Sequence, residues 1–245
     1  MKYFRVVLFV AVFFMMAGFV VKEKPKPFAV VELFTSEGCS SCPSADELLK
    51  EMTEILQKEG KEVLSLSFHV TYWNKYGWED PYSKEVYTDR QKKYVATLKS
   101  ETLYTPQAIV NGKKEFVGSS PISFRDIVTE VLADSPSYEI QAQAKKENNQ
   151  VTINYELNKE PKNILLNIVV VENSIVHKVL KGENQNRVLK HYNVVRSLET
   201  IEPKQKDQIT IQWPEDLAKE KGSIIVYAQN PKSLKITGAT KLIVE

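Results

Sequence analysis

Two cysteines separated by two serines are the residues of this chain best suited to chemistry. Cys39-Ser40-Ser41-Cys42 forms a C-x-x-C pair, and it contains both cysteines of the 245 residues. An apolar, strand-like run precedes the pair and leucines at helical spacing follow it, which predicts that the cysteines lie at the N-terminus of a helix. The unpaired N–H groups and positive dipole end at that position favour a thiolate at Cys39. The pattern therefore favours thiol–disulfide exchange, with Cys39 as the attacking thiol and Cys42 as the resolving thiol.

Other interpretations of the pair stay open at this point. A structural disulfide across so short a loop contributes only roughly 2 kcal/mol in the chain-entropy model, and two unconnected buried thiols are a further alternative. A zinc site needs two more ligands, and His69, His177 and His191 are not spaced as zinc ligands usually are. Two soft thiolates suit Cu(I), so copper handling on the same scaffold is the alternative function. Redox exchange is preferred, and it needs no organic cofactor.

The composition excludes several classes of protein. Apolar residues make up 42% and charged residues 26% of the chain, values typical of a packed soluble protein and too apolar for general disorder. Lys and Arg number 33 against 31 Asp and Glu, and two of the positive residues, Lys2 and Arg5, precede the apolar N-terminal run. The remaining body is neutral and has no basic tract, so nucleic acid is not an expected partner.

The N-terminus predicts export. Val6–Val21 is a run of 16 residues without a charge, which suits the core of a signal peptide and is shorter than the roughly 20 residues of a membrane-spanning helix. Residues 1–21 are therefore a signal peptide or, because the cleavage signal at Ala17-Gly18 is weak, an uncleaved N-terminal anchor. We expect the body to work in the periplasm or cell envelope, where disulfides persist, without further contact with the membrane.

Hydrophobic patterning divides the body into two regions separated by a break at 133–137. The first, 28–133, predicts the order β-α-β-α-β-β-α, with an α/β domain as the result. The second, 138–245, contains short strand-like runs joined by polar turns and predicts an all-β, sandwich-like domain. Its predicted strands are 138–144, 151–157, 164–171, 175–180, 193–198, 208–213, 223–228 and 236–244.

Residues 28–132 resemble the thioredoxin fold, and four motifs extend the resemblance over nearly the whole body. They are VELFTSEGCSSCPSAD (31–46), SFHVTYWNKYGWEDPYS (67–83), YTPQAIVNG (104–112) and HYNVVR (191–196). Together they are similar to a secreted bacterial family of thioredoxin-like proteins of unknown function with a β-rich C-terminal domain. The middle motif of that family has acids at the positions of Thr71 and Asn74. The resemblance implies a thioredoxin-like domain and a redox-active cysteine pair that acts on protein thiols or disulfides, and it implies no particular substrate.

Thr105 and Pro106 are predicted to shape a substrate groove. A proline that opens a strand, in a protein with a C-x-x-C pair at a helix start, is a candidate cis-proline. A cis bond would turn the Thr105 backbone toward the disulfide, where an extended polypeptide can pair with it; an ordinary trans proline is the alternative. His69, Trp73 and Trp78 belong to an irregular aromatic stretch that either lines the same groove, with His69 close enough to tune a thiol, or closes the domain as an aromatic plug.

Glu32 is the predicted proton acceptor. Thioredoxins carry a buried acid on the equivalent strand, usually six residues before the first cysteine, whereas Glu32 lies seven residues before Cys39. By this resemblance Glu32 takes the proton of Cys42 when that thiol resolves a mixed disulfide. The alternative is a solvated carboxylate at the end of a strand.

The second region has one polar cluster, formed by residues 182–187 and 191–196. Arg187 or Arg196 is expected to pair with a carboxylate of the first region, with Asp80 as the candidate. The alternative is a local turn with solvated charges.

Overall fold

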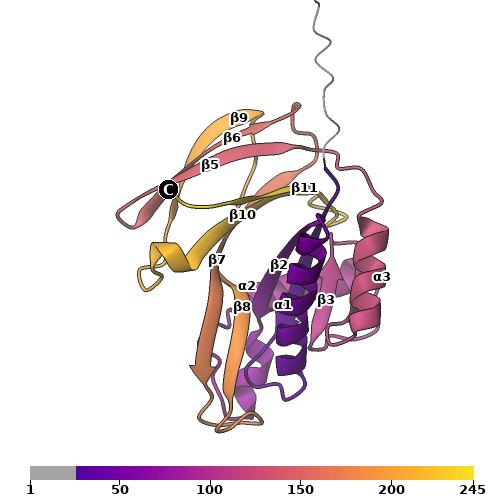
Figure 1. Ribbon diagram of the computed structural model, residues 1–245, viewed down its shortest axis with the longest axis vertical. Coiled ribbons are helices and arrows are strands. Elements are labelled where there is room, and N and C mark those ends of the chain that lie inside the picture. The colour runs from indigo at the N-terminus through magenta and orange to yellow at the C-terminus, as the bar shows by residue number, and fades with distance from the viewer. Residues whose placement is uncertain (1–25) are drawn as a thin grey trace, which may run out of the picture.

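A computed structural model describes residues 26–245, and the predicted signal peptide or anchor at 1–21 lies outside the described residues. The fold is mixed α/β (Figure 1). Eight strands form one mixed sheet in the order β11-β10-β7-β8-β2-β1-β3-β4, and three strands form a separate antiparallel sheet in the order β5-β6-β9. No helix within residues 26–245 is long and apolar enough to cross a membrane.

The first half of the chain supplies one end of the large sheet. β1 and β2 are parallel and are connected by α1, while β3 and β4 continue the sheet in antiparallel pairing. Their order along the chain agrees with the hydrophobic pattern. The elements are β1 (Phe28–Thr35), α1 (Cys42–Lys58), β2 (Glu62–His69), η1 (Thr71–Tyr76), α2 (Glu85–Leu98), β3 (Gln107–Val110), β4 (Lys114–Val117) and α3 (Pro121–Val131).

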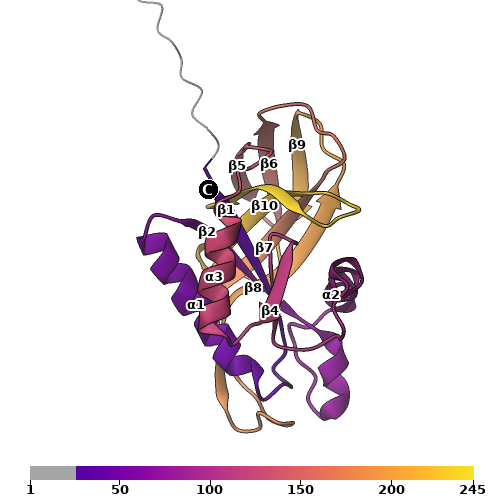
Figure 2. The same cartoon turned by 90° about the vertical axis from the view of Figure 1, so that its right-hand side faces the viewer.

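Helices cover both faces of this end of the sheet, as Figure 2 shows, with α1 and α3 on one face and α2 on the other. Val31 and Leu33 of β1 belong to the core that contains residues of α1 and α3, whereas Val30 and Phe34 belong to the core that contains residues of α2. Alternate residues of a strand point to opposite faces. Every residue of β1 is consequently buried.

The second half of the chain extends the same sheet. β8 pairs in parallel with β2, with Ser67 opposite Val194, so the sheet is continuous between the two halves. The three-stranded sheet packs over β7, β10 and β11 around a third core. The elements are β5 (Ile140–Glu147), β6 (Gln150–Leu157), β7 (Leu165–Lys178), β8 (Val188–Ile201), β9 (Lys206–Gln212), η2 (Lys219–Lys221), β10 (Gly222–Gln229) and β11 (Ile236–Leu242).

β7 and β8 are longer than the sequence pattern predicts. The pattern predicts two strands, 164–171 and 175–180, where the structure has the single strand β7. The polar residues between the two runs are accommodated within the sheet, because Glu172 pairs with Arg196 and the Asn173 side chain accepts a hydrogen bond from Ser223. The two strands form a long hairpin that extends along the sheet toward the end of the molecule where α1 begins (Figure 1).

Candidate redox site at the Cys39–Cys42 disulfide

Cys39 and Cys42 form a disulfide at the start of α1. Cys42 is the first residue of the helix, and Pro43 follows at a position where a missing N–H costs nothing. The preceding loop is closed by backbone bonds: the N–H of Cys39 donates to the Ser36 carbonyl and that of Cys42 to the Cys39 carbonyl, each at 3.2 Å. Both cysteines are 0% exposed. The disulfide is therefore formed at the predicted helix start but lies beneath the surface.

The tip of the β7–β8 hairpin, residues 179–187, contacts the loop that carries Cys39. Asn184 Nδ2 donates to the carbonyl oxygens of Glu37 at 2.8 Å and Cys39 at 2.9 Å. Arg187 Nη1 donates to Asn184 Oδ1 at 2.6 Å and so orients the amide. Asn184 is buried by these contacts. A residue of the second half of the chain thus holds the backbone of the first cysteine.

Glu183 adds a charge to the same contact. Its Oε2 accepts a hydrogen bond from the Ser40 N–H at 3.0 Å, and hydrogen bonding by the side chain and the backbone of Ser40 lowers the pKa of the Glu183 carboxyl. Gly182 packs closely on Trp78, because a Cβ at Gly182 would lie 3.0 Å from the Trp78 Cβ. The hairpin tip therefore makes polar contacts with the cysteine loop and an apolar contact with Trp78.

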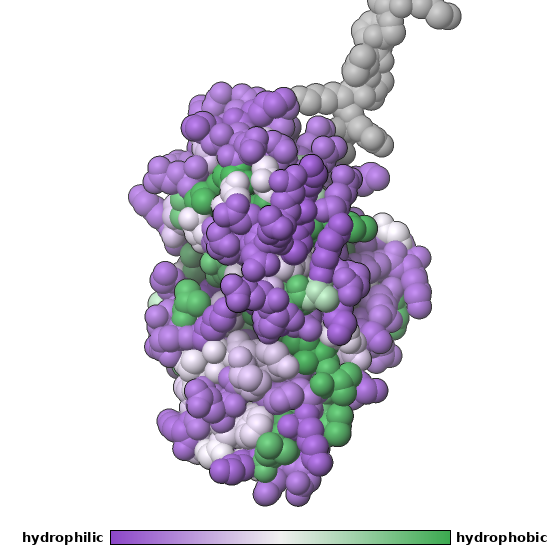
Figure 3. Space-filling model, turned by 90° about the vertical axis from the view of Figure 1, so that its left-hand side faces the viewer, coloured by the Kyte–Doolittle hydropathy of each residue, from purple (hydrophilic) through white to green (hydrophobic). Residues whose placement is uncertain are grey.

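The outer surface of the hairpin is partly apolar. Val176, Leu180 and Val188 are exposed to 63%, 57% and 60%. Figure 3 faces the side of the molecule on which the hairpin lies and shows apolar side chains gathered toward its lower end. Apolar surface of this kind next to a disulfide is available for contact with another polypeptide.

His191 lies between two buried carboxylates beside the disulfide. Its Nδ1 is 3.1 Å from Asp46 Oδ2, and its Nε2 is 3.2 Å from Glu37 Oε1. Burial disfavours a charge on the imidazole, but the hydrogen bonds and charges of Asp46 and Glu37 outweigh burial and raise the pKa of His191 to about 10. Burial acts against ionisation of Glu37 as well, yet its hydrogen bonds, that of His191 first, lower its pKa. An imidazolium of β8 therefore connects the cysteine loop to α1.

The other two histidines join this cluster. His177 Nδ1 lies 2.7 Å from Glu37 Oε1. His69 Nδ1 lies 2.7 Å from Asp80 Oδ2, which also accepts the Glu37 N–H at 2.8 Å. Burial opposes the charge of Asp80, but the charge of His69 and these hydrogen bonds lower its pKa. His69 thus reaches the cysteine loop through Asp80, and its predicted tuning of a thiol stays a prediction.

The two predicted tryptophans also lie beside the cysteine loop. Trp78 Nε1 donates to Glu37 Oε2 at 2.8 Å. Trp73 packs against the loop at Gly38, where an added Cβ would lie 3.2 Å from the Trp73 Cβ. Both side chains are partly buried, so they fill space against the loop and retain an accessible part.

Thr105 and Pro106 are joined by a cis peptide bond, as the sequence context predicts. The Thr105 hydroxyl accepts a hydrogen bond from Trp73 Nε1 at 2.7 Å. Pro106 lies beside the first turn of α1, since a Cβ at Gly118 would meet both Ala45 and Pro106 at 3.4 Å. The structure therefore brings these residues to the region of the disulfide, and their contact with a substrate stays a prediction.

Glu32 is not brought to the cysteines. It is fully buried, and its Oε1 accepts two hydrogen bonds from Arg90, at 2.9 Å and 2.7 Å, while its Oε2 accepts one from Tyr94. Both partners belong to α2, on the face of the sheet opposite α1. A shift of one residue along a strand reverses the face, and the position six residues before the first cysteine is Leu33, which faces α1. Neither a relay to Cys42 nor a solvated strand end fits this placement.

Several residues of the cluster were not among the sequence-predicted site residues, among them Glu37, Asp46, Asn184 and His191. Glu37 and Asp46 flank the cysteine pair in the sequence, two residues before Cys39 and four after Cys42. Two acids so close to a C-x-x-C pair are a signal that could have identified them. Asn184 belongs to the polar cluster of the second region, but its contact with the cysteine loop has no local signature.

The predicted pairing of Arg187 or Arg196 with Asp80 is wrong. Asp80 is occupied by His69. Arg196 instead forms ion pairs with Glu172 and Asp216, both in the second half of the chain. Arg196 of β8 therefore pairs with a carboxylate of the neighbouring strand β7, Glu172, and with none among the described residues of the first half of the chain.

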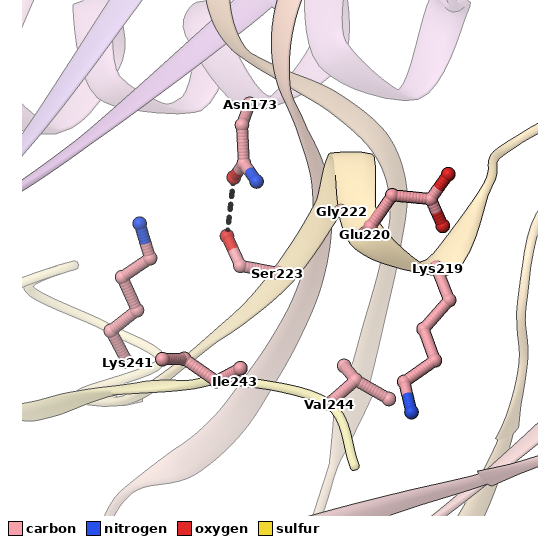
Figure 4. A pocket seen from close by; sticks show the side chains of 8 residues that line it. All are labelled: Asn173, Lys219, Glu220, Gly222, Ser223, Lys241, Ile243 and Val244. Atoms are coloured by element: carbon pink, nitrogen blue, oxygen red, sulfur yellow. Dashed lines mark hydrogen bonds between the residues drawn. The ribbon is translucent and has the colours of Figure 1, made fainter.

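A separate pocket of about 640 Å³ lies near the C-terminal end of the chain (Figure 4). It contains two lysines, and burial lowers the pKa of one of them, Lys241. None of the residues of the cysteine site lines it. Within residues 26–245, no group of three or more His, Cys, Asp or Glu side chains is arranged to hold a metal ion. The lining residues are Asn173, Lys219, Glu220, Gly222, Ser223, Lys241, Ile243 and Val244.

Comparisons with known proteins place the chain in a family. The crystal structure of protein AGR_C_4864 from Agrobacterium tumefaciens is similar, with a TM-score of 0.66 and 25% identity over 90% of this chain and 96% of that chain. A domain of the outer membrane lipoprotein Omp28 from Porphyromonas gingivalis matches with a TM-score of 0.31 and 9% identity, over 45% of this chain and 89% of that chain, which is too distant for any argument. No curated protein matches the chain. The family described as protein of unknown function (DUF1223) matches residues 30–229, which include both cysteines and His191, and the chain belongs to that family.

Proposed function

We propose that this protein is a thiol–disulfide oxidoreductase of the cell envelope that acts on protein thiols or disulfides. The observation that carries the proposal is the Cys39–Cys42 disulfide at the N-terminus of α1, in a loop between a buried strand and a helix. The thioredoxin-like character of the first half and the sandwich-like character of the second are part of the proposal. So is the export of the chain, which the first 21 residues suggest.

The chemistry follows from the positions of the two sulfurs. In the reduced protein, Cys39 attacks a client disulfide, its sulfur forms a bond to one client sulfur, and the other client sulfur leaves as a thiolate. Cys42 then attacks Cys39, so the intramolecular disulfide forms and the second client thiol is released. Two electrons pass from the protein to the client, and oxidation of a client dithiol runs through the same steps in reverse.

The apolar surface of the hairpin supports a polypeptide client. The hairpin that contacts the cysteine loop exposes Val176, Leu180 and Val188, and exposed apolar side chains suit a polypeptide better than a small thiol. Pro106 lies beside the first turn of α1, and the backbone of Thr105 is the proposed partner of the extended client chain.

The test is a glutathione redox titration of the metal-free full-length protein together with trapping of a mixed disulfide. We expect the pair to titrate reversibly at a potential between about −270 and −120 mV, the range of exchange-active proteins. Cys42→Ser should accumulate a mixed disulfide with a client protein, and the matched variant Cys39→Ser should not. A pair that stays oxidised below about −300 mV and traps no client would contradict the proposal. Tight binding of Cu(I) by the reduced protein, without exchange, would favour copper handling instead.

A further inference from the structure

Asp46 is a buried carboxylate on the same face of α1 as Cys42. The two residues are four apart on the helix, a spacing that brings Cβ atoms to within about 5–6 Å of each other. Helical side chains lean toward the N-terminus, so the Asp46 carboxylate leans back toward the turn that carries Cys42. Cys42 is 0% and Asp46 is 1% exposed. The pair is therefore sequestered from water.

One oxygen of this carboxylate has a partner and the other has none. Oδ2 pairs with His191 Nδ1 at 3.1 Å. Oδ1 is buried without a hydrogen-bond donor among the described residues. A buried carboxylate oxygen without a hydrogen-bond donor is energetically unfavourable, and a nearby donor group would relieve this cost. The reduced protein has such a group one helical turn away, the thiol of Cys42.

We propose that Asp46 Oδ1 accepts the proton of Cys42 when that thiol resolves the mixed disulfide, with His191 as the residue that positions the carboxylate. This inference rests on the proposed function. In the step, the S–H bond of Cys42 breaks and its proton passes to Asp46, while the Cys42 sulfur forms a bond to Cys39. The bond between Cys39 and the client sulfur breaks, and the client leaves as a thiolate that takes a proton from water.

The charge balance around Asp46 favours the uptake of one proton. When His191 is counted as a cation and Asp46 and Glu37 as carboxylates, these three side chains carry a net charge of minus one. One added proton neutralises it. The pKa of His191, raised to about 10, keeps the imidazole protonated near neutral pH, so the imidazole itself is not the acceptor.

The other charged groups near Asp46 already have partners or lie outside the pair. Asp80 is paired with His69, and His177 contacts Glu37 Oε1, the oxygen that also contacts His191, and not Asp46. Lys50, one turn further along α1, lies over the ring of Tyr192, with 4.8 Å between Nζ and the ring centroid. None of them supplies a proton to Asp46 Oδ1.

The experiment compares Asp46→Asn with Glu47→Gln, an exposed acid next to it on the same helix. The full-length reduced protein is mixed with a peptide disulfide, and the decay of the mixed disulfide is followed by rapid acid quenching between pH 5 and 10. General-base catalysis contributes about 10²-fold or more, so we expect Asp46→Asn to slow resolution by that factor at pH 7. The deficit should shrink at alkaline pH, where hydroxide replaces the carboxylate as the base that removes the Cys42 proton. Glu47→Gln should match the unchanged protein, and alkylation of Cys39 should be equal in all three.

The remaining outcomes separate the role of Asp46 from the proposed function. An unchanged pH profile in folded Asp46→Asn overturns the role of Asp46 and leaves the proposed function intact. Failure of Cys42→Ser to form any mixed disulfide refutes the function itself. If Asp46→Asn does not fold, infrared difference spectra of the unchanged protein replace it. Reduction should shift the stretching band of one buried carboxylate, because Oδ1 gains a donor only when Cys42 carries a proton, and a spectrum without such a shift refutes the inference.

Discussion

Glu32 joins elements that are far apart in the sequence through a buried ion pair. Its carboxylate accepts from Arg90 of α2, and Tyr227 of β10 lies within hydrogen-bond distance at 3.3 Å. The Arg90 guanidinium also stacks over the rings of Phe68 and Tyr94. Such a fully partnered group is typical of a residue that organises packing. We therefore expect Glu32 to act on stability and not on the redox step.

Replacing Glu32 with Gln tests this expectation. Removal of one partner from a buried pair leaves the other charge uncompensated, which costs about 3–5 kcal/mol. Urea unfolding of Glu32→Gln should show a loss of that order, with the lifetime of the mixed disulfide unchanged. Glu62→Gln, at the exposed start of β2, is the control. Slower resolution with unchanged stability would restore Glu32 as the proton acceptor.

His191 gives folding stability a specific dependence on pH. Its pKa rises from 6.5 to about 10 on folding, so the native state binds the proton more tightly than the unfolded chain does. This contribution is complete below pH 6.5 and is lost progressively as the pH rises toward 10, with a slope of roughly 1 kcal/mol per pH unit. Glu37 has a lowered pKa, so its contribution is present above its unfolded pKa and is lost as the pH falls.

Urea unfolding as a function of pH tests this linkage. Stability should decline between pH 7 and pH 10, and His191→Gln should abolish most of that decline. His177→Gln is the control, because His177 contacts the same carboxylate but is partly exposed. An identical alkaline slope in His191→Gln and the unchanged protein would mean that His191 is neutral in the native state.

Local patterns predicted the residues of the disulfide, but not the residues that surround it. Cys39, Cys42 and the cis-proline follow from short motifs. A difference of one residue decides on which face of the sheet Glu32 lies. Counting residues from Cys39 back through the turn to the strand does not fix that position. His191 reaches Asp46 only because β8 pairs with β2, and this contact between distant segments leaves no periodic signal in either of them.

At the level of elements, we expect the β7–β8 hairpin to control access to the disulfide. Both cysteines are buried, and the hairpin tip is held at the cysteine loop by Asn184 and Glu183. If the proposed function holds, exchange with a protein client requires the tip to move. A contact held by a few hydrogen bonds at the end of a hairpin is the kind that opens locally without global unfolding.

Asn184→Ala should accelerate reduction of the disulfide. The substitution removes two buried hydrogen bonds to the loop, at about 0.5–1.5 kcal/mol each, and a decrease of about 1.4 kcal/mol in the opening free energy corresponds to a tenfold rate. The rate of reduction by dithiothreitol should rise by about that factor. Gln185→Ala, an exposed neighbour in the tip, is the control. An unchanged rate would show that the tip does not limit access.

At the scale of the whole molecule, the continuous sheet makes the two halves depend on each other. The order of elements in each half was predictable, because helical and strand periodicity are local properties. The parallel pairing of Ser67 with Val194 was not, and neither was the merging of two predicted strands into β7. The division into domains at 28–133 and 138–245 stays a prediction, and from the buried contacts of His191 with Asp46 and Glu37 we expect that the first of them does not fold alone.

A fragment that ends at residue 136 tests this dependence. It lacks His191, so Asp46 and Glu37 lose their shared cation, and β2 becomes an open edge. We expect the fragment to lack a near-ultraviolet circular dichroism signal and to aggregate, whereas the full chain does not. A fragment that unfolds cooperatively and keeps its thiol reactivity would establish an independent first domain.

The imidazolium between Asp46 and Glu37 also has an evolutionary consequence. A recombination event at the break between the two regions would join acids from one parent to a histidine strand from another, and only parents that share all three residues would keep the acids paired with their cation. We therefore expect recombination to be disfavoured at the place where the sequence looks most divisible. The two regions should be inherited together.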